Sequence, residues 1–397
     1  MTLARVAVTG VGVICSLGRN QREYWANMLE GRRGIGKLDL FDASGCLSDI
    51  AAQADLQPCS HRRDSRTDRL HMTAADEAVA QAGLAGAGAL DGFGISFGNS
   101  NAGMLESEGW VREGLAGGFD RVSPSLVMRL PTSAPADAVA RRLSLSGPRL
   151  SNMTACASSA LSIGFAADLI RNGDAPGMIT GGGDGLCLMT YAGFNALRLI
   201  DTAPCRPFDV SRQGLTLGEG AGILVLEDWD HAAARGARPL VEFLDYGTSC
   251  DANHMTAPHP EGRGAAAAMQ QALQRSGLSP AQIGHINAHG TGTPMNDAAE
   301  ARAILAVFGP ERAPRVPVTS SKSMVGHLLG GSGGLEAVTL VLSLMSQMVP
   351  PTPGFTKADP GVMLDIVSPP ARKVSFEYGL SNSFGFGGTN CSLIFKR

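Results

Sequence analysis

The sequence predicts an α/β fold in which β-strands alternate with helices and the helices cover the sheets. Short apolar stretches with strand character, such as residues 94–98 and 283–288, end in glycine-rich or polar loops. Longer stretches with apolar residues three or four positions apart lie between them, as at residues 67–82. The chain has 397 residues, which is too many for one small core, so two halves are expected.

The first half of the chain predicts the following elements in order. We expect a strand at residues 5–9 running into a glycine turn, a helix at 22–30, irregular surface at 31–60, a helix at 67–82 and a strand at 94–98. Residues 99–150 form a mixed insertion that is typical of a cap or an oligomer contact. A helix that starts at Cys156 and stops at Gly173, and strands at 178–180 and 221–226, complete this part.

The second half repeats the alternation. Strands are predicted at residues 240–250, 283–288, 316–320, 374–376 and 392–395, and helices at 264–276 and 334–347. In each half a strand leads into a small-residue loop with a reactive side chain, Cys156 or His327, and then into a helix. An internal duplication is therefore plausible, although no residue identity demonstrates it.

Composition argues against several classes of function. The net charge is −3, so no overall basic field attracts nucleic acid or a membrane. The eight cysteines include no CxxC pair and no zinc-type spacing, so we expect no metal site and a reducing, cytoplasmic setting. The apolar runs at the N-terminus and at residues 335–349 are too short or too polar to span a bilayer, which predicts a soluble protein.

Cys156 is the first candidate for chemistry. It lies among small residues where a turn is expected to become a helix, and helix N-termini favour the thiolate form of a cysteine. The alternative is a buried structural cysteine, since free cysteines are among the most buried residues.

His289 and His327 both follow predicted strands and stand among Gly, Ser and Thr, where backbone can approach a ligand closely. One thiol and one histidine would suffice for hydrolysis. A second histidine is useful when another charge must be stabilised, such as the enolate formed when a carboxylated thioester loses carbon dioxide. A structural role for each histidine, taken alone, is the alternative.

Three further residues are candidates for supporting roles. Lys322 and Glu336 could form an ion pair that orients His327, unless both are solvated. Phe386 lies in a glycine hairpin, where it could gate the thiol, and a backbone N–H of this hairpin could join that of Cys156 in an oxyanion hole.

Six short motifs, spread in order over nearly the whole chain, resemble those of the elongating β-ketoacyl-acyl-carrier-protein synthases of the thiolase-like superfamily. They are Thr154-Ala-Cys156-Ala-Ser, Arg206-Pro-Phe-Asp, Leu217-Gly-Glu-Gly-Ala-Gly222, Asn287-Ala-His289-Gly-Thr-Gly-Thr, Lys322-Ser-Met-Val-Gly-His327 and Asn382-Ser-Phe-Gly-Phe386-Gly-Gly-Thr-Asn390.

The resemblance implies a five-layer α-β-α-β-α fold of two similar halves. Residues 1–240 would carry the nucleophilic cysteine and the cap or dimer insertion, and residues 241–397 the two catalytic histidines. Cys156 would accept an acyl chain from acyl-carrier protein, and His289 and His327 would assist decarboxylation of malonyl-carrier protein. Lys322 and Glu336 match the family's supporting pair, Thr291 and Thr293 its pantetheine-binding positions, and Phe386 its gate.

The resemblance also implies a homodimer, no bound cofactor, and acyl-carrier protein as the partner that delivers substrates on its phosphopantetheine arm. Carrier proteins are acidic, so a basic landing patch is expected. The candidate residues are Arg62, Arg63, Arg66, Arg69, Arg121 and Arg206, although a solvated charge face is an open alternative.

Three functions stay open at this level. The first is fatty acid elongation by two carbons. The second is a ketosynthase of a specialised type II polyketide, aryl-polyene or modified-lipid pathway. The third is a non-catalytic chain-length-factor partner subunit in a heterodimer, against which the intact Cys156, His289 and His327 argue.

Overall fold

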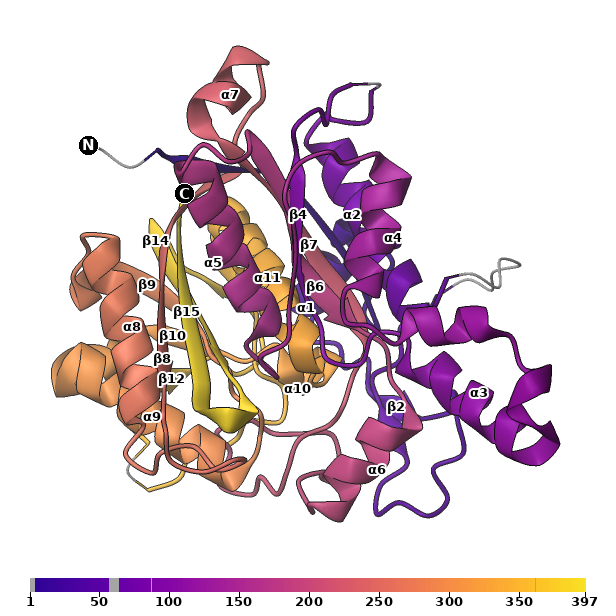
Figure 1. Cartoon of the computed structure of the whole chain (residues 1–397). Coiled ribbons are helices and arrows are strands. Elements are labelled where there is room, and N and C mark those ends of the chain that lie inside the picture. The colour runs from indigo at the N-terminus through magenta and orange to yellow at the C-terminus, as the bar shows by residue number, and fades with distance from the viewer. Residues whose placement is uncertain (1–3, 57–63, 87, 361) are drawn as a thin grey trace.

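A computed structural model describes residues 4–56, 64–86, 88–360 and 362–397 (Figure 1). Eleven strands of the described residues form one continuous hydrogen-bonded sheet in the order β12-β10-β9-β14-β15-β8-β1-β7-β6-β4-β5. The middle of this order is a weak junction. Strand β1 (Val6–Cys15) pairs with β8 (Val241–Cys250) only through Val6–Val8. We therefore describe the strands on the two sides of this junction as two sheets.

The N-terminal half supplies one sheet and its helices. After β1 come α1 (Gln21–Leu29), β2 (Gly36–Lys37), β3 (Ile50–Ala51), α2 (Arg66–Gln81), β4 (Gly94–Gly98), α3 (Met104–Gly117), η1 (Phe119–Arg121), η2 (Pro124–Arg129), α4 (Ala134–Leu143), β5 (Arg149–Asn152), α5 (Ser158–Arg171), β6 (Gly177–Asp184), α6 (Leu188–Ala196), β7 (Gly220–Asp228) and α7 (Trp229–Ala234).

The C-terminal half starts at β8. It continues with α8 (Arg263–Arg275), η3 (Pro280–Gln282), β9 (Ile283–Asn287), α9 (Pro294–Arg312), η4 (Ala313–Arg315), β10 (Pro317–Thr319), α10 (Lys322–Val325), η5 (Leu329–Gly331), α11 (Ser332–Ser346), β11 (Met348–Val349), β12 (Asp365–Ile366), β13 (Arg372–Lys373), β14 (Tyr378–Phe384), η6 (Phe386–Gly388) and β15 (Thr389–Lys396).

The two halves repeat one topology, which supports the suggested duplication. Strands β1, β7, β6, β4 and β5 lie side by side with antiparallel, antiparallel, parallel and parallel pairings. Strands β8, β15, β14, β9 and β10 repeat that series of pairings. In this correspondence β5 and α5 match β10 and α11. The loops that carry Cys156 and His327 therefore occupy equivalent positions in the two halves.

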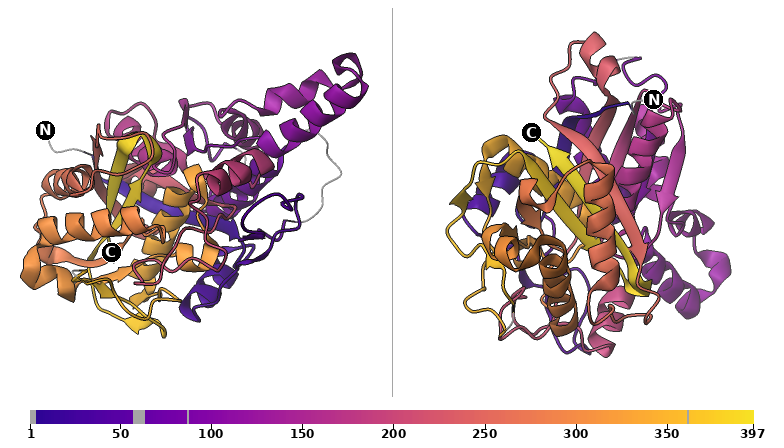
Figure 2. Two further views of the ribbon diagram at one scale, coloured as in Figure 1. Left: turned by 90° about the horizontal axis from the view of Figure 1, so that it is seen from below. Right: turned by 90° about the vertical axis from the view of Figure 1, so that its left-hand side faces the viewer.

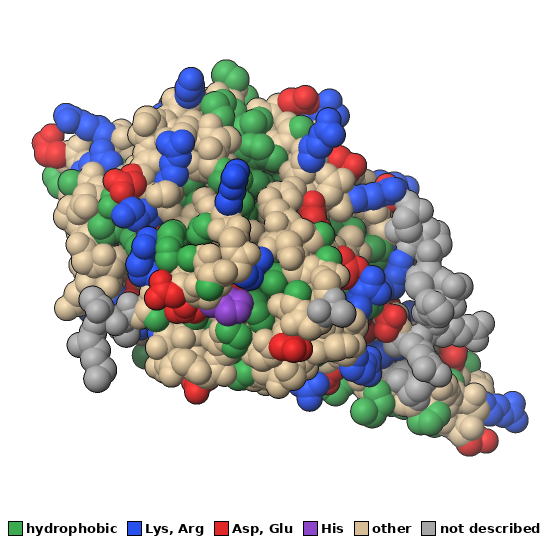
Figure 3. All heavy atoms as spheres, turned by 90° about the horizontal axis from the view of Figure 1, so that it is seen from above, with side chains coloured by type: hydrophobic (Ala, Val, Ile, Leu, Met, Phe, Trp, Pro, Cys, Tyr) green, Lys and Arg blue, Asp and Glu red, His purple; other side chains and the backbone are tan. Residues whose placement is uncertain are grey.

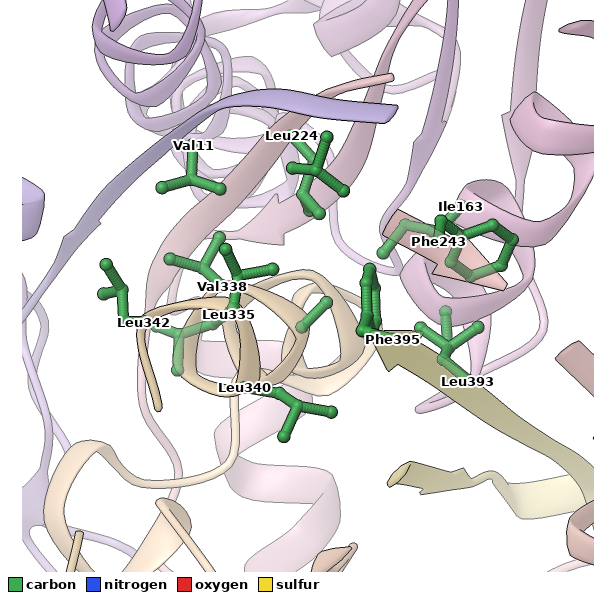
Figure 4. Packing of buried hydrophobic residues seen from close by; sticks show 14 of the residues in the cluster. Val11, Ile163, Leu224, Phe243, Leu335, Val338, Leu340, Leu342, Leu393 and Phe395 are labelled. Atoms are coloured by element: carbon green, nitrogen blue, oxygen red, sulfur yellow. The ribbon is translucent and has the colours of Figure 1, made fainter. Parts of the chain in front are cut away.

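The predicted five layers are present. Helices α2 and α4 cover one face of the first sheet, and α8 and α9 cover the outer face of the second. Helices α5 and α11 lie between the two sheets and contact both (Figure 1). Figure 4 shows how α11 packs Leu335 and Val338 toward Val11 and Leu224 of the first sheet, and how Phe395 of the second sheet lies nearby.

Two glycine-containing strands are longer than predicted. The glycine turn expected after residue 9 is wrong, because β1 continues through Gly10 and Gly12 to Cys15. These glycines allow α2 to approach the strand: a Cβ at Gly10 would lie 2.1 Å from the carbonyl oxygen of Ala78. Strand β6 likewise runs through its glycines to Asp184.

The strand predicted at residues 374–376 is wrong. Those residues form irregular backbone between β13 and β14, and the buried Phe376 donates its N–H to the side chain of Gln347 instead of to a strand. Helices α6 and α9 were not predicted. The apolar residues of α9 show only a weak helical period, and the helix bends at Gly309. Pro294 occupies its first position, where proline is favourable.

The insertion at residues 99–150 contains α3, η1, η2 and α4. Figure 2 shows that its first part, α3 with η1 and η2, projects from the body of the molecule. Several large apolar side chains on this projection and on the neighbouring α6 are exposed, namely Val111, Leu115, Phe119, Val127, Met128, Leu130 and Met189. This surface has the composition of a protein contact.

One segment of the described residues, Leu329–Ser346, is long and apolar enough to cross a membrane by length and composition. It corresponds to η5 and α11, which form the central layer, and 89% of it is buried inside the protein. Its apolar character therefore fits a core helix packed between two sheets.

Candidate active site

Cys156 lies in a sharp turn between β5 and α5. Ala155 has the left-handed φ of +49°, and Ser158 braces the turn by accepting the N–H of Thr154 at 2.8 Å and donating to the carbonyl of Ala155 at 2.6 Å. Helix α5 begins at Ser158, so Cys156 precedes the helix instead of occupying its first turn. The turn points the thiol toward the junction of the two halves.

Burial disfavours the thiolate that was expected at Cys156. Burial raises the pKa of the thiol to about 11, and the positive charge of Lys322 and the backbone N–H of Phe386 only partly oppose that effect. The side chain is 5% exposed. The helix dipole therefore does not determine the protonation of this cysteine.

His327 is the nearest titratable neighbour of the thiol, with its Nε2 atom 3.1 Å from Sγ. The N–H of Leu329 donates to Nδ1 of this ring at 3.1 Å, and the hydroxyl of Ser332 lies 2.8 Å from the same nitrogen. A backbone N–H can only donate, so Nδ1 of the neutral ring is an acceptor and the proton resides on Nε2. His327 therefore presents a hydrogen-bond donor to the site.

His289 is fixed in the same tautomer by a different group. The ammonium of Lys322 lies 3.3 Å from Nδ1 and donates to the backbone carbonyl of His289 at 2.7 Å. Since an ammonium has no acceptor, Nδ1 accepts and Nε2 carries the proton. The carboxylate of Glu300 accepts the N–H groups of His289 and Gly290, each at 2.8 Å, and so holds the loop that follows β9.

Both histidines are neutral at physiological pH. Burial lowers the pKa of His289 well below its ordinary value, and the charges of Lys322 and then His327 lower it further. Burial and Lys322 do the same to His327. The two rings are 5.4 Å apart and nearly perpendicular. Two neutral N–H donors in a buried site can stabilise a negative charge that develops during a reaction.

The thiol and the two imidazoles could in principle bind a metal ion, because their ligand atoms all lie within 4.8 Å of one another. A metal would need the lone pair of each Nε2 atom. The hydrogen bonds to both Nδ1 atoms place protons on Nε2 instead. These residues therefore fit an oxyanion better than a cation.

Lys322 and Glu336 form the predicted ion pair, and both are only 1% exposed, so the solvated alternative is wrong. Burial raises the pKa of Glu336 to about 7, with Lys322 opposing. The pair was expected to orient His327. The contacts of Lys322 instead go to the ring and carbonyl of His289, because α10 places the lysine beside the end of β9.

A pocket leads from the surface to the thiol, and its free volume is only about 60 Å³, enough for a few water molecules. Phe386 lies in its wall and stacks on Phe194, with ring centroids 5.6 Å apart. Thr291 and Thr293 also line it, and their hydroxyls are 2.9 Å apart. The predicted gate and pantetheine positions therefore meet at one pocket.

Gly385 allows the hairpin that carries Phe386 to lie against the turn of Cys156. A Cβ atom at Gly385 would be 2.8 Å from the carbonyl oxygen of Thr154 and 3.2 Å from the backbone nitrogen of Cys156. This close approach lets the N–H of Phe386 reach the sulfur. A side chain at residue 385 would push that donor away.

The described arginines of the predicted patch come from separate segments of the chain, namely α2, η1 and the loop at residue 206. Arg66 is committed to the buried Glu219, with Nε 2.8 Å from Oε2, and it also donates to the carbonyl of Ala54. Arg206 pairs with Asp201 at 2.7 Å.

Of the other four arginines of that prediction, the two that the structure describes lie on different elements. Arg121 is exposed on the projection at η1, and Arg69 is half-buried on α2 beside Arg142 and Asp76. Arg62 and Arg63 lie outside the described residues. Figure 3 shows one face on which Lys and Arg are scattered among Asp and Glu. Arg66 and Arg206 are each already paired with an acid, and the docking area itself stays a prediction.

Sequence reasoning missed several residues that shape the site. Phe194 and Glu300 belong to helices that were not predicted, and Ser332 was given no role. Asp184 follows three glycines at the end of a strand. A carboxylate at the carboxyl end of a strand, where sites in α/β folds form, is a signal that could have identified it.

Comparison with known proteins agrees with this geometry. The model of the β-ketoacyl synthase N-terminal domain matches residues 3–232, and that of the C-terminal domain matches residues 240–356. The chain is 40% identical to 3-oxoacyl-acyl-carrier-protein synthase 2 of Synechocystis sp., over 99% of this chain and 98% of the relative. It is 39% identical to the synthase of that name from Staphylococcus aureus, with the same coverage.

Solved structures give the same result. The ishigamide ketosynthase/chain length factor superposes with a TM-score of 0.94 at 34% identity, covering 100% of this chain and 99% of that one. The type II polyketide ketosynthase AntDE, solved with its acyl-carrier protein AntF, gives 0.90 at 29% identity and full coverage of both chains.

The layered fold and the cysteine with two neutral histidines define an acyl-transferring condensing enzyme of the thiolase-like class. The chain belongs to the β-ketoacyl synthase family.

Proposed function

We propose that the protein condenses an acyl group held on Cys156 with a malonyl unit and so extends the chain by two carbons. In the first step Sγ attacks the thioester of an acyl-carrier protein, the bond from the acyl carbon to the carrier's sulfur breaks, and the proton of the Cys156 thiol passes to that sulfur, so that the carrier's thiol leaves. The backbone N–H groups of Cys156 and Phe386 stabilise the tetrahedral oxyanion. The contact of the Phe386 N–H with the sulfur supports this role.

In the second step the malonyl thioester oxygen accepts the Nε2–H groups of His289 and His327. The carboxylate leaves as carbon dioxide, and its bonding electrons form an enolate, whose charge the two donors stabilise. One such donor typically contributes ~10²–10³ in rate. The enolate carbon then attacks the acyl-cysteine, and Sγ leaves as the product is released. The single observation that supports this step most strongly is that a donor faces Nδ1 of each ring, which leaves the proton on Nε2.

Thr291 and Thr293 are proposed to bind the pantetheine arm, because their hydroxyls line the pocket between the surface and the thiol. Phe386 is proposed to move aside when an acyl chain enters, since the pocket that it borders is too small for a long chain. The substrates arrive on acyl-carrier protein, and no other cofactor is needed. The complex of AntDE with its carrier protein supports that partner.

We further propose a homodimer, in which the exposed apolar surface of the projection and α6 contributes to the contact. The alternative is a heterodimer with a ketosynthase-like partner, as the name of the ishigamide structure suggests for that protein. Native mass spectrometry distinguishes two identical chains from one chain that awaits a partner. The described cysteines are all free, which supports a cytoplasmic location.

The condensation is tested with purified protein, malonyl-carrier protein and acyl-carrier proteins of graded chain length, with products read by intact mass. We expect an acyl adduct on Cys156 and a β-keto product two carbons longer. Saturated donors extended over a broad range of lengths favour fatty acid synthesis. Reaction only with polyketo or polyene donors favours the specialised alternative. If no donor acylates Cys156, the proposal is wrong.

A further inference from the structure

Asp184 is a fully buried carboxylate at the end of β6, and it lies outside the pocket wall. It accepts the N–H groups of Ser100 and Asn101, at 2.9 and 2.7 Å, from the loop after β4 in the N-terminal half. It also accepts the N–H of Gly330, at 2.8 Å, from the C-terminal half. The carboxylate therefore joins backbone of the two halves through both oxygens.

The C-terminal partner of Asp184 belongs to the turn that fixes His327. This turn, η5, joins His327 to α11, and its Leu329 has the left-handed φ of +51°, a conformation that is unfavourable for a non-glycine residue. Leu329 N–H and the Ser332 hydroxyl, at the two ends of the turn, are the groups that contact Nδ1 of His327. A strained turn keeps this arrangement only if its surroundings hold it.

The turn is seated tightly on the N-terminal half. A Cβ atom at Gly330 would lie 2.6 Å from the backbone carbon of Asn99, and one at Gly331 would lie 2.5 Å from Cα of Gly183. Neither position has room for a side chain. The backbone of the turn therefore packs directly against the ends of β4 and β6, at Asn99 and Gly183.

We propose that Asp184 is a positioning residue that holds the Leu329–Gly331 turn and thereby keeps the proton of His327 on Nε2. This inference rests on the proposed function, in which that proton binds the malonyl thioester oxygen. Asp184 touches no substrate in this scheme and acts only through the turn. Outer residues of this kind commonly fix the tautomer and orientation of a functional histidine.

The hydrogen bonds at residue 184 favour a carboxylate. Burial raises the pKa of Asp184 to about 7, and the backbone N–H groups that it accepts oppose that rise. Backbone N–H donors converge on both oxygens, so each oxygen must be an acceptor. The amide of an Asp184→Asn variant would turn its NH₂ group toward one set of these donors and lose that hydrogen bond. We expect the strained side, at Gly330, to release first, so that Leu329 N–H no longer fixes the ring.

Asp209→Asn is a matched control. Asp209 is also fully buried, and its carboxylate accepts the N–H of Ser211 at 2.8 Å from its own half and those of Thr356 and Lys357, at 2.7 and 3.1 Å, from the other. None of its contacts reaches the η5 turn. A general loss of stability should affect both variants alike, whereas an effect on His327 should be confined to Asp184→Asn.

The first measurement is the nitrogen spectrum of the protein labelled with ¹⁵N-histidine, in which His327→Ala assigns the signal. Wild-type protein and Asp209→Asn are expected to show His327 protonated on Nε2, and Asp184→Asn a mixture of tautomers. The second measurement compares malonyl decarboxylation with acyl transfer to Cys156. Decarboxylation by Asp184→Asn should fall by at least about tenfold while acyl transfer changes much less.

An unchanged tautomer in Asp184→Asn, or equal losses of both half-reactions, would overturn the proposal. If Asp184→Asn does not fold, Gly330→Ala tests the same link, because its Cβ would lift the turn from Asn99 and leave the carboxylate intact. Gly330→Ala must then give the mixed tautomer. A different result would refute the proposed function and not this inference. In that case the tautomer changes in the variants as expected, but the wild-type protein does not decarboxylate malonyl-carrier protein.

Discussion

At the scale of single residues, the chemistry of the site depends on the protonation of Cys156, His289 and His327. Cys156, His289 and His327 could be selected because each stands beside small residues after a strand. The thiolate expected from a helix start is disfavoured, because the thiol precedes the helix and is buried. Protonation depends on burial and on Lys322, Leu329 and Ser332, which reach the site from other parts of the fold.

The raised pKa of Cys156 predicts how fast the thiol is alkylated at different pH values. Only the thiolate reacts, so below a pKa of about 11 the rate should rise about tenfold per pH unit between pH 7 and 9. Iodoacetamide labelling of the Cys156 peptide, measured by mass, tests this. The peptide that contains the exposed Cys250 is followed in the same digest as an internal reference. A rate that is already constant above pH 7 would contradict the raised pKa.

At the scale of elements, the longer helices and strands with a clear period could be predicted, whereas α6, α9 and several short strands could not. The glycine-containing segments were misjudged because of close contacts. Gly10 and Gly12 read as a turn but continue a strand, since α2 needs the space. The glycine hairpin of Phe386 was recognised, yet its contact with the turn of Cys156 was not. Such contacts depend on which elements become neighbours, and that information is not local in the sequence.

The contact of Gly385 predicts a selective loss of acyl transfer. In Gly385→Ala the new Cβ meets the carbonyl of Thr154, so the hairpin should move and carry the Phe386 N–H away from the thiol. Acylation of Cys156, followed by intact mass, should slow by roughly tenfold to hundredfold, because small displacements of a donor are costly.

Gly193→Ala controls for a glycine change near the same pocket. Gly193 lies in α6, and a Cβ there meets nothing within 4 Å. Alanine favours a helix, so this variant should keep the wild-type rate and gain a little stability. A slow Gly193→Ala variant, or a normal Gly385→Ala variant, would show that the hairpin contact does not control acylation.

At the scale of the whole molecule, the site exists because two similar halves face each other. The nucleophile comes from the loop between β5 and α5, and His327 comes from the equivalent loop between β10 and α11. The α/β class and the alternation could be predicted from pattern, and the five layers from the resemblance. The contact of Lys322 with His289 could not, because it joins distant elements of the C-terminal half. The role of Asp184 could not, because its hydrogen bonds cross between the halves.

The central claim is that the two halves contribute separable steps, acyl transfer by Cys156 and decarboxylation by the histidines. The most direct measurement is carbon dioxide release from malonyl-carrier protein by Cys156→Gln, alone and combined with His289→Ala or His327→Ala. We expect release to persist in the single variant and to fall by ~10²–10³ when either histidine is removed. Release that stops in Cys156→Gln, or that survives the removal of either histidine, would contradict the claim.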